Sequence, residues 1–314
     1  MQTAMITLIT LVAFAANSVL CRWALMDQTI DPLSFSIVRI VSGALTLLIL
    51  LCLSFNARLK SASVKSKVKV DIAVDNVSVR SKIQAQFDLT AIVALLVYMF
   101  GFSFAYVKLG AGLGALVLFV AVQFTMIAAH LISGNRMSLI EWCGCLLSVT
   151  GLVYLLMPSQ SIAAPDFLSV MLMVLAGIGW GIYTLAGKKS LNALQSTAAN
   201  FGFCSLAILA LLTLLILLPN AMPLLKITKQ GMIYAVISGA VASGMGYSLW
   251  YYVVKKLDTV LASIAQLSVP VIATLGGVIL LSEPVTKQFV ISSTVILLGI
   301  GLVIVAPKLN TKRS

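Results

Sequence analysis

A few polar side chains able to bind a small solute stand inside long hydrophobic runs of this sequence. The main ones are Asn17, Arg39, Gln123 and Gln266. An amide or guanidinium group left without a partner in hydrocarbon costs several kcal/mol. We therefore expect each of these groups to meet either a bound solute or a polar group of a neighbouring segment.

The sequence offers little for catalysis or metal binding. It contains one histidine, His130, and 9 acidic residues against 21 Lys and Arg. One histidine cannot form a His-based metal cluster, and Glu141 and Glu283 lie at the ends of separate hydrophobic runs. We therefore predict that the protein is not an enzyme and uses no metal or cofactor.

Composition indicates that lipid is the solvent for most of the chain. Of the 314 residues, 61% are hydrophobic and only 10% are charged, and the mean hydropathy is +1.09. A soluble domain carries about 25% charged residues. The net charge of +12 does not indicate nucleic-acid binding, because the basic residues separate hydrophobic runs instead of covering one face.

Hydrophobic runs of about 20 residues predict an all-α polytopic membrane protein with ten transmembrane helices. The expected spans are 5–25, 32–55, 89–107, 110–132, 139–157, 167–186, 197–218, 230–253, 259–281 and 287–306. Their connections are short except for residues 56–88, a polar and basic loop that we expect to be disordered.

The placement of Lys and Arg predicts the orientation in the membrane. With both termini in the cytoplasm, the inner connections hold most of these residues, and they still hold the majority when 56–88 is set aside. The positive-inside rule therefore places the N and C termini on the cytoplasmic side of the inner (plasma) membrane.

The two halves of the chain share a layout. A shift of 148 residues places KLGAGLGALVLF (108–119) on KLDTVLASIAQL (256–267) and Gly151 on Gly299. Because each half has an odd number of spans, the second half must enter the membrane upside down, as in many secondary transporters. The predicted units are a five-helix repeat at 1–157, a periplasmic linker at 158–166 and an inverted five-helix repeat at 167–314.

Two predicted helices carry pronounced polar faces. In 110–132, Gln123 lies near mid-span on the same face as His130, and either a solute or an interhelical hydrogen bond would satisfy it. In 259–281, Pro270 cannot donate to the carbonyl of Gln266, so a backbone acceptor stands beside a side-chain amide. Interrupted helices of this kind line transport sites, although a simple kink has the same pattern.

Aromatic side chains provide a further set of candidates for lining a pocket, because they recur on single helix faces. These candidates are Tyr98, Phe102, Trp180, Tyr183 and Tyr247. Trp250 and Tyr251 lie near the predicted inner interface, where we assign them to an aromatic belt. Glycines at 177, 179, 181, 239, 244 and 246 are predicted to permit close helix packing.

The two arginines inside predicted spans need different explanations. Arg22 lies within about one turn of the outer end of its span, where it can reach water or pair with Asp27 or Asp31. Arg39 lies some 10 Å below its span end at ~1.5 Å per residue, near the limit of snorkelling. We expect Arg39 to face the interior and to meet a carbonyl, a hydroxyl or a substrate carboxylate. Asn17 shares the face that the first helix turns toward the same interior.

Several stretches resemble the EamA-type branch of the drug/metabolite transporter superfamily. They are GALVLFVAVQFTM (114–126), GIGWGIYTLAG (177–187), FSFAYVKL (102–109) and AQLSVPVIATLGGVILLSEPVT (265–286). The resemblance covers the chain except 56–88 and implies a bacterial inner-membrane transporter of small metabolites. The family commonly has Gly-Glu after the fourth span, as Glu283 stands after the ninth, whereas this chain has Asn135 there.

These features predict a transporter that exports a small metabolite, such as an amino acid, by alternating access. Arg22, His130, Glu141 and Glu283 are candidates for an outer mouth or for ion coupling. Multidrug efflux is an alternative, and so is a non-transporting membrane scaffold or sensor that docks through 56–88. The expected partners are a small-molecule substrate and the lipid bilayer, without nucleic acid, and the chain is expected to be a monomer or homodimer.

Overall fold

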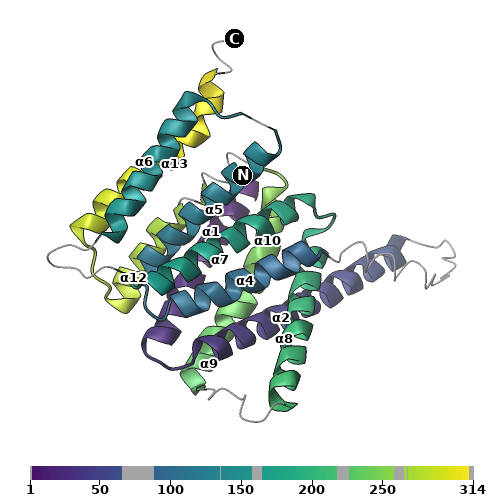
Figure 1. Ribbon diagram of the computed structural model, residues 1–314. Coiled ribbons are helices and arrows are strands. Elements are labelled where there is room, and N and C mark those ends of the chain that lie inside the picture. Colours follow the sequence, from purple (N-terminus) through teal and green to yellow (C-terminus); the bar gives the residue numbers. More distant parts are fainter. Residues whose placement is uncertain are drawn as a thin grey trace.

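The computed structural model describes residues 2–65, 88–134, 136–157, 165–217, 226–257, 265–266 and 268–310. Within these ranges the chain is helical and forms no strand, apart from an isolated antiparallel bridge between Ile30 and Ile227. The elements, shown in Figure 1, are α1 (Gln2–Met26), α2 (Pro32–Lys65), α4 (Leu89–Ala105), α5 (Ala111–Ile132), α6 (Leu139–Leu156), α7 (Phe167–Lys189), α8 (Ala193–Leu217), α9 (Lys229–Ile237), η1 (Ser238–Met245), α10 (Gly246–Val254), α12 (Ser268–Leu281) and α13 (Lys287–Asn310).

Each predicted span overlaps a helical segment, and six of these segments are long and apolar enough to cross a membrane. The six are Gln2–Met26, Pro32–Asn56, Ala111–Ile132, Phe167–Lys189, Ala193–Thr213 and Lys229–Val254. The other apolar helices, which are shorter, are Leu89–Ala105, Leu139–Leu155, Ser268–Leu281 and Lys287–Gly299. The all-helical membrane architecture is thus confirmed for the described residues.

The apolar span predicted at 32–55 agrees with the candidate membrane span Pro32–Asn56, but the predicted start of the following loop is wrong. The α2 helix continues to Lys65 and takes up the first residues of the segment expected to be a disordered loop. Residues 56–65 contain no Gly or Pro that would end a helix. Most of the predicted loop lies outside the described residues, as do Asn135, residues 158–164 and the junction at 267 that precedes α12.

The eighth predicted span contains a change of helix type. Between α9 and α10, η1 is a π-helix, in which one extra residue enters each turn. Gly239 of η1 packs directly on the backbone of α2, since a Cβ at this position would lie 2.7 Å from the Cα of Arg39. Only glycine therefore allows η1 and α2 to approach at this level.

Other glycines confirm the prediction that they serve close packing. A Cβ on Gly177 would lie 2.5 Å from the carbonyl oxygen of Leu118 in α5, and a Cβ on Gly179 would lie 2.7 Å from that of Ala94 in α4. The α7 helix thus sits between α4 and α5 at backbone contact. In lipid, where burying apolar surface gives little driving force, such close contacts hold helices together.

The α6 and α13 helices form an antiparallel pair on one flank of the protein (Figure 1). A Cβ on Gly299 would lie 2.5 Å from the carbonyl oxygen of Gly144 and 2.7 Å from the amide nitrogen of Ser148. A Cβ on Gly151 would lie 3.1 Å from the amide nitrogen of Ile296. The 148-residue shift takes Gly151 to Gly299 and Ser148 to Ile296. The contact of Gly299 with Ser148 and the contact of Gly151 with Ile296 are therefore equivalent, with the two helices exchanged. A two-fold relation between two antiparallel helices produces this pattern.

Glu283 and Arg22 hold several helix ends together. The Glu283 carboxylate accepts hydrogen bonds from the backbone N–H of Ala111, at 2.8 and 3.0 Å, and from Arg22 Nε at 3.2 Å. Arg22 Nη1 also donates to the carbonyl oxygens of Tyr106 and Val107. The carboxylate thus caps the positive N-terminus of α5 while tying it to α1 and α12.

The expectation that Arg22 pairs with Asp27 or Asp31 is therefore wrong. Asp31 instead accepts hydrogen bonds from the backbone N–H of Ser34 and of Lys226, which joins the start of α2 to the segment before α9. An ion pair between Lys108 and Asp166, 2.7 Å long, makes a further link near this end. The hydrogen bond from Lys108 is the main reason that the pKa of Asp166 is lowered to about 2.

We predict that Gly299→Val disrupts the α6–α13 pair, because the new side chain would displace the backbone of α6. Overpacking of this kind costs about 1–3 kcal/mol. Thermal unfolding of the purified protein in detergent should start at a lower temperature than in wild type. The matched control is Gly301→Val on the same helix, where a Cβ meets nothing within 4 Å. Equal unfolding temperatures for the two variants would contradict the packing described here.

We predict that Glu283→Gln destabilises the protein by about 1–2 kcal/mol, because the charge-assisted bonds to Ala111 N–H and Arg22 are weakened. Thermal unfolding in detergent measures the loss. Asp27→Asn removes an exposed acid after α1 and should leave stability unchanged. If Glu283→Gln and wild type unfold at the same temperature, the Glu283 carboxylate does not stabilise the fold.

Candidate binding site

The Arg39 side chain lies at the centre of the protein and contacts both halves of the chain. It is 0% exposed. Its Nε donates to Ser243 Oγ at 2.8 Å, and its Nη2 donates to the hydroxyls of Tyr98 at 3.1 Å and Tyr247 at 2.5 Å. The prediction that Arg39 faces the interior and meets hydroxyl groups is confirmed.

Asn17 completes the polar cluster from the opposite side. Its Nδ2 donates to the hydroxyls of Tyr98 at 3.2 Å and Tyr247 at 3.3 Å, and these two hydroxyls are 2.8 Å from each other. Its Oδ1 accepts a hydrogen bond of 2.5 Å from Ser238. A short polar network therefore joins α1, α2 and α4 to η1 and α10. We call Asn17, Arg39, Tyr98, Ser238, Ser243 and Tyr247 the central cluster.

Aromatic rings enclose the central cluster. The guanidinium carbon of Arg39 lies 4.8 Å from the centroid of the Phe102 ring and 5.3 Å from that of Tyr98, within cation–π range. The Trp180 ring lies 5.0 Å from that of Tyr98 and 4.6 Å from that of Tyr247. Trp180 Nε1 in turn donates to Gln266 Oε1 at 3.1 Å. Six predicted candidates from five distant stretches of sequence thus come together: Arg39, Tyr98, Phe102, Trp180, Tyr247 and Gln266.

Tyr183, Trp250 and Tyr251 extend this aromatic group along α7 and α10. All three are buried. Tyr251 donates its hydroxyl to the backbone carbonyl of Tyr183 at 2.9 Å, and their ring centroids are 4.8 Å apart. The assignment of Trp250 and Tyr251 to a lipid-facing belt is therefore wrong, since both rings pack between helices.

The remaining candidates occupy varied positions. Gln123 is buried on α5, and Pro270 is buried on α12. His130 is exposed in the last turn of α5. Glu141 accepts a hydrogen bond from the backbone N–H of Ser138, while the Ser138 hydroxyl accepts from Glu141 N–H, so together they form a capping box for α6. A coupling role for His130 or Glu141 stays a prediction.

Three residues of the site were missed by the sequence analysis. Phe14 packs against the rings of Trp180 at 5.1 Å and Tyr247 at 5.8 Å. Ser238 and Ser243 reach Asn17 and Arg39 from η1. The available signal was the SGAVASG stretch, in which two hydroxyls occur among small residues at bilayer depth.

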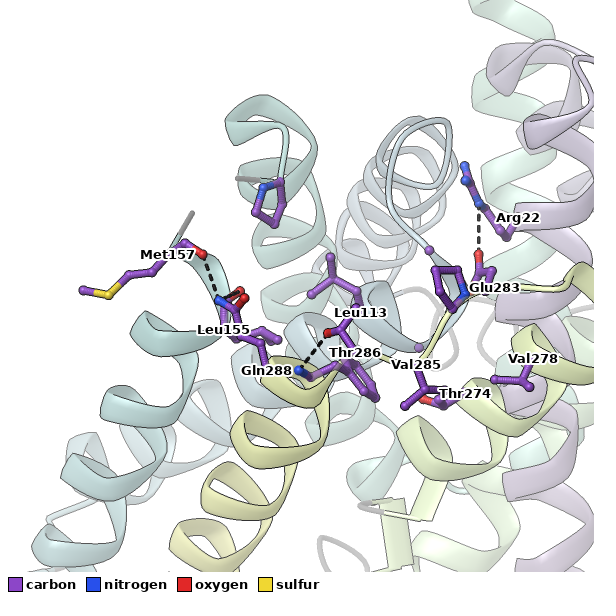
Figure 2. A pocket seen from close by; sticks show the side chains of 15 residues that line it. Arg22, Leu113, Leu155, Met157, Thr274, Val278, Glu283, Val285, Thr286 and Gln288 are labelled. Atoms are coloured by element: carbon purple, nitrogen blue, oxygen red, sulfur yellow. Dashed lines mark hydrogen bonds and ion pairs between the residues drawn. The ribbon is translucent and has the colours of Figure 1, made fainter. Parts of the chain in front are cut away.

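A cavity of about 260 Å³ lies at the end of the protein held together by Arg22 and Glu283. Figure 2 shows these two side chains joined at its side and Gln288 reaching toward Met157. Thr274 and Thr286 add hydroxyls to the lining. This cavity is lined by residues of α1, α5, α6, α12 and α13. The central cluster is buried between α1, α2, α4, α7, η1 and α10.

The chemistry available in the central cluster is recognition, not bond making. It offers a permanent cation, neutral hydroxyls, one amide and several aromatic faces. Within the described ranges, no three His, Cys, Asp or Glu side chains gather into a group that could hold a metal ion. A solute that entered the central cluster would meet charge, hydrogen-bonding groups and ring faces.

A family model and several known proteins match the sequence of this chain. The EamA-like transporter family matches residues 1–157 and 167–305. An uncharacterized protein of Pseudomonas aeruginosa is 38% identical over 309 residues, which make up 98% of this chain and 96% of that protein. The threonine/homoserine exporter RhtA of Escherichia coli K12 is 28% identical over 195 residues, 60% of this chain and 59% of the exporter.

A solved crystal structure of another protein aligns with a TM-score of 0.57, over 94% of this chain and 96% of that one. At 17% identity this likeness concerns the fold alone. The family match covers both halves of the chain and confirms the resemblance drawn from the sequence stretches. The chain belongs to the EamA-like transporter family.

Proposed function

We propose that the protein is a secondary-active or facilitative transporter that exports a small metabolite, such as an amino acid, by alternating access. The observation that carries this proposal is the central cluster, in which Arg39 and Asn17 of the first half bond to Ser243, Tyr247 and Ser238 of the second. A site shared between two repeats is where secondary transporters bind their substrates.

The arrangement of helix ends supports a bundle of ten spans built from inverted repeats. The antiparallel α6–α13 pair has the reciprocal contacts that an inverted repeat requires. The contacts of Arg22, Glu283, Asp31 and Lys108 involve the C-terminal ends of α1, α4 and α12 and the starts of α2, α5, α7 and α9. All of these ends fall on the side predicted to be outside, which fits cytoplasmic termini and a bacterial inner membrane.

The charge of the site favours metabolites over cationic drugs. A bulky organic cation would bring a second positive charge beside Arg39, which is unfavourable in a low dielectric. A zwitterion or a neutral molecule meets no such penalty. The likeness to an exporter of threonine and homoserine, over part of the chain, supports amino acids as the substrate class.

We predict that cells overproducing wild-type protein accumulate at least one amino acid or related metabolite in the medium, and that Arg39→Ala or Gln123→Ala abolishes this accumulation. Mass spectrometry of the medium measures it, at matched membrane abundance. The control is Arg136→Ala, an exposed arginine that should behave like wild type. Identical media for wild type and cells lacking the protein would overturn the proposed function, whereas identical media for wild type and the two site variants would overturn the site.

A further inference from the structure

The hydrogen bonds of Arg39 leave part of its guanidinium group unused. A guanidinium has five N–H donors in a fixed plane. Nε bonds to Ser243, and Nη2 bonds to both Tyr98 and Tyr247. Nη1, with two donors, is buried and has no hydrogen-bond partner. A buried N–H group that makes no hydrogen bond destabilises the folded protein.

The charge of Arg39 is also left without a counterion in the part of the chain that the structure describes. The ion pairs there are Arg22–Glu283 and Lys108–Asp166, and no acid pairs with Arg39. Every group that hydrogen-bonds the guanidinium is a neutral hydroxyl. The faces of Phe102 and Tyr98 reduce the cost of the buried charge but do not cancel it.

A carboxylate supplies what this site lacks. It carries one negative charge, which balances Arg39, and two acceptor oxygens spaced to match the edges of a guanidinium. A phosphate dianion would leave excess negative charge beside a single cation. A cation would add to the charge already buried. We propose that Arg39, through Nη1, binds the carboxylate of the transported substrate, so that the substrates are small solutes with one free carboxylate.

The neighbouring groups fit the rest of an amino acid. The guanidinium lies over the Tyr98 ring, and the rings of Trp180 and Tyr247 pack beside that ring, where their faces can accept an ammonium group by cation–π contact. Because Arg39 and these rings are buried, the substrate reaches them only when the two halves move apart. One carboxylate oxygen then binds Nη1 while the other takes the place of Tyr247 at Nη2, so binding compensates for a hydrogen bond broken between the halves.

This inference rests on the proposed function and is tested with purified wild-type protein in liposomes. One set of liposomes is loaded with the twenty protein amino acids and a second set with the carboxamides of the same amino acids. Mass spectrometry follows efflux from both sets. We expect at least one amino acid to leave through the protein and its carboxamide to leave about 30-fold more slowly or not at all.

The outcomes separate the inference from the proposed function. If an amino acid and its carboxamide leave equally fast, the protein transports amino acids but Arg39 does not bind a carboxylate, and the inference is overturned. If neither set shows efflux above that of protein-free liposomes, the proposed function and the inference both fail. Because this comparison uses the wild-type protein, it does not depend on any variant folding.

Variants give a second readout. Arg39→Gln should slow efflux of the amino acid by about 30-fold or more and abolish the preference for acid over carboxamide. Arg39→Lys keeps the charge without the planar fork, so we expect it to retain the preference with weaker binding. Arg136→Gln makes the same chemical change at an exposed position and should match wild type. Retained preference in a folded Arg39→Gln protein would contradict the proposal.

Discussion

Burying the Arg39 guanidinium takes a full positive charge out of water, and the surrounding structure is built to hold it. The hydroxyls of Tyr98, Ser243 and Tyr247 face its nitrogens, and the ring of Phe102 lies over its plane. These groups come from α4, η1 and α10, so the hydrogen bonds to Nε and Nη2 form completely only when both halves of the chain are in place. Its position therefore fixes how α2 meets the second half.

The π-helix and its glycine follow from this requirement. A hydroxyl reaches Arg39 Nε only if η1 lies against α2 at backbone distance, and Gly239 removes the side chain that would prevent it. The extra residue in each π turn lets Ser238 bond to Asn17 while Ser243 bonds to Arg39. A regular α-helix would space these two serines differently around the axis. The unusual geometry thus serves the polar contacts between the halves.

The sequence predicted the positions of helices and the buried arginine well, because both follow from the cost of exposing polar groups to lipid. The cluster of Tyr98, Trp180 and Tyr247 was also anticipated, since each ring lies deep in its span. The partner of Arg22 and the burial of Trp250 were not, because they depend on which helices become neighbours. A single sequence with one weak internal repeat does not specify that packing. The two serines of η1 escaped notice because hydroxyls are common in membrane helices.

The two arginines join the halves in different ways, and the difference fits the proposed alternating access. Arg22 makes an ion pair with Glu283 near the end of the bundle, where both charges are partly exposed. When such a pair separates, water can solvate each ion, so the cost is small. An ion pair at Arg39 would strand two charges in a low dielectric on separation. Neutral hydroxyls at the centre avoid that penalty, and they leave the positive charge of Arg39 available to a ligand.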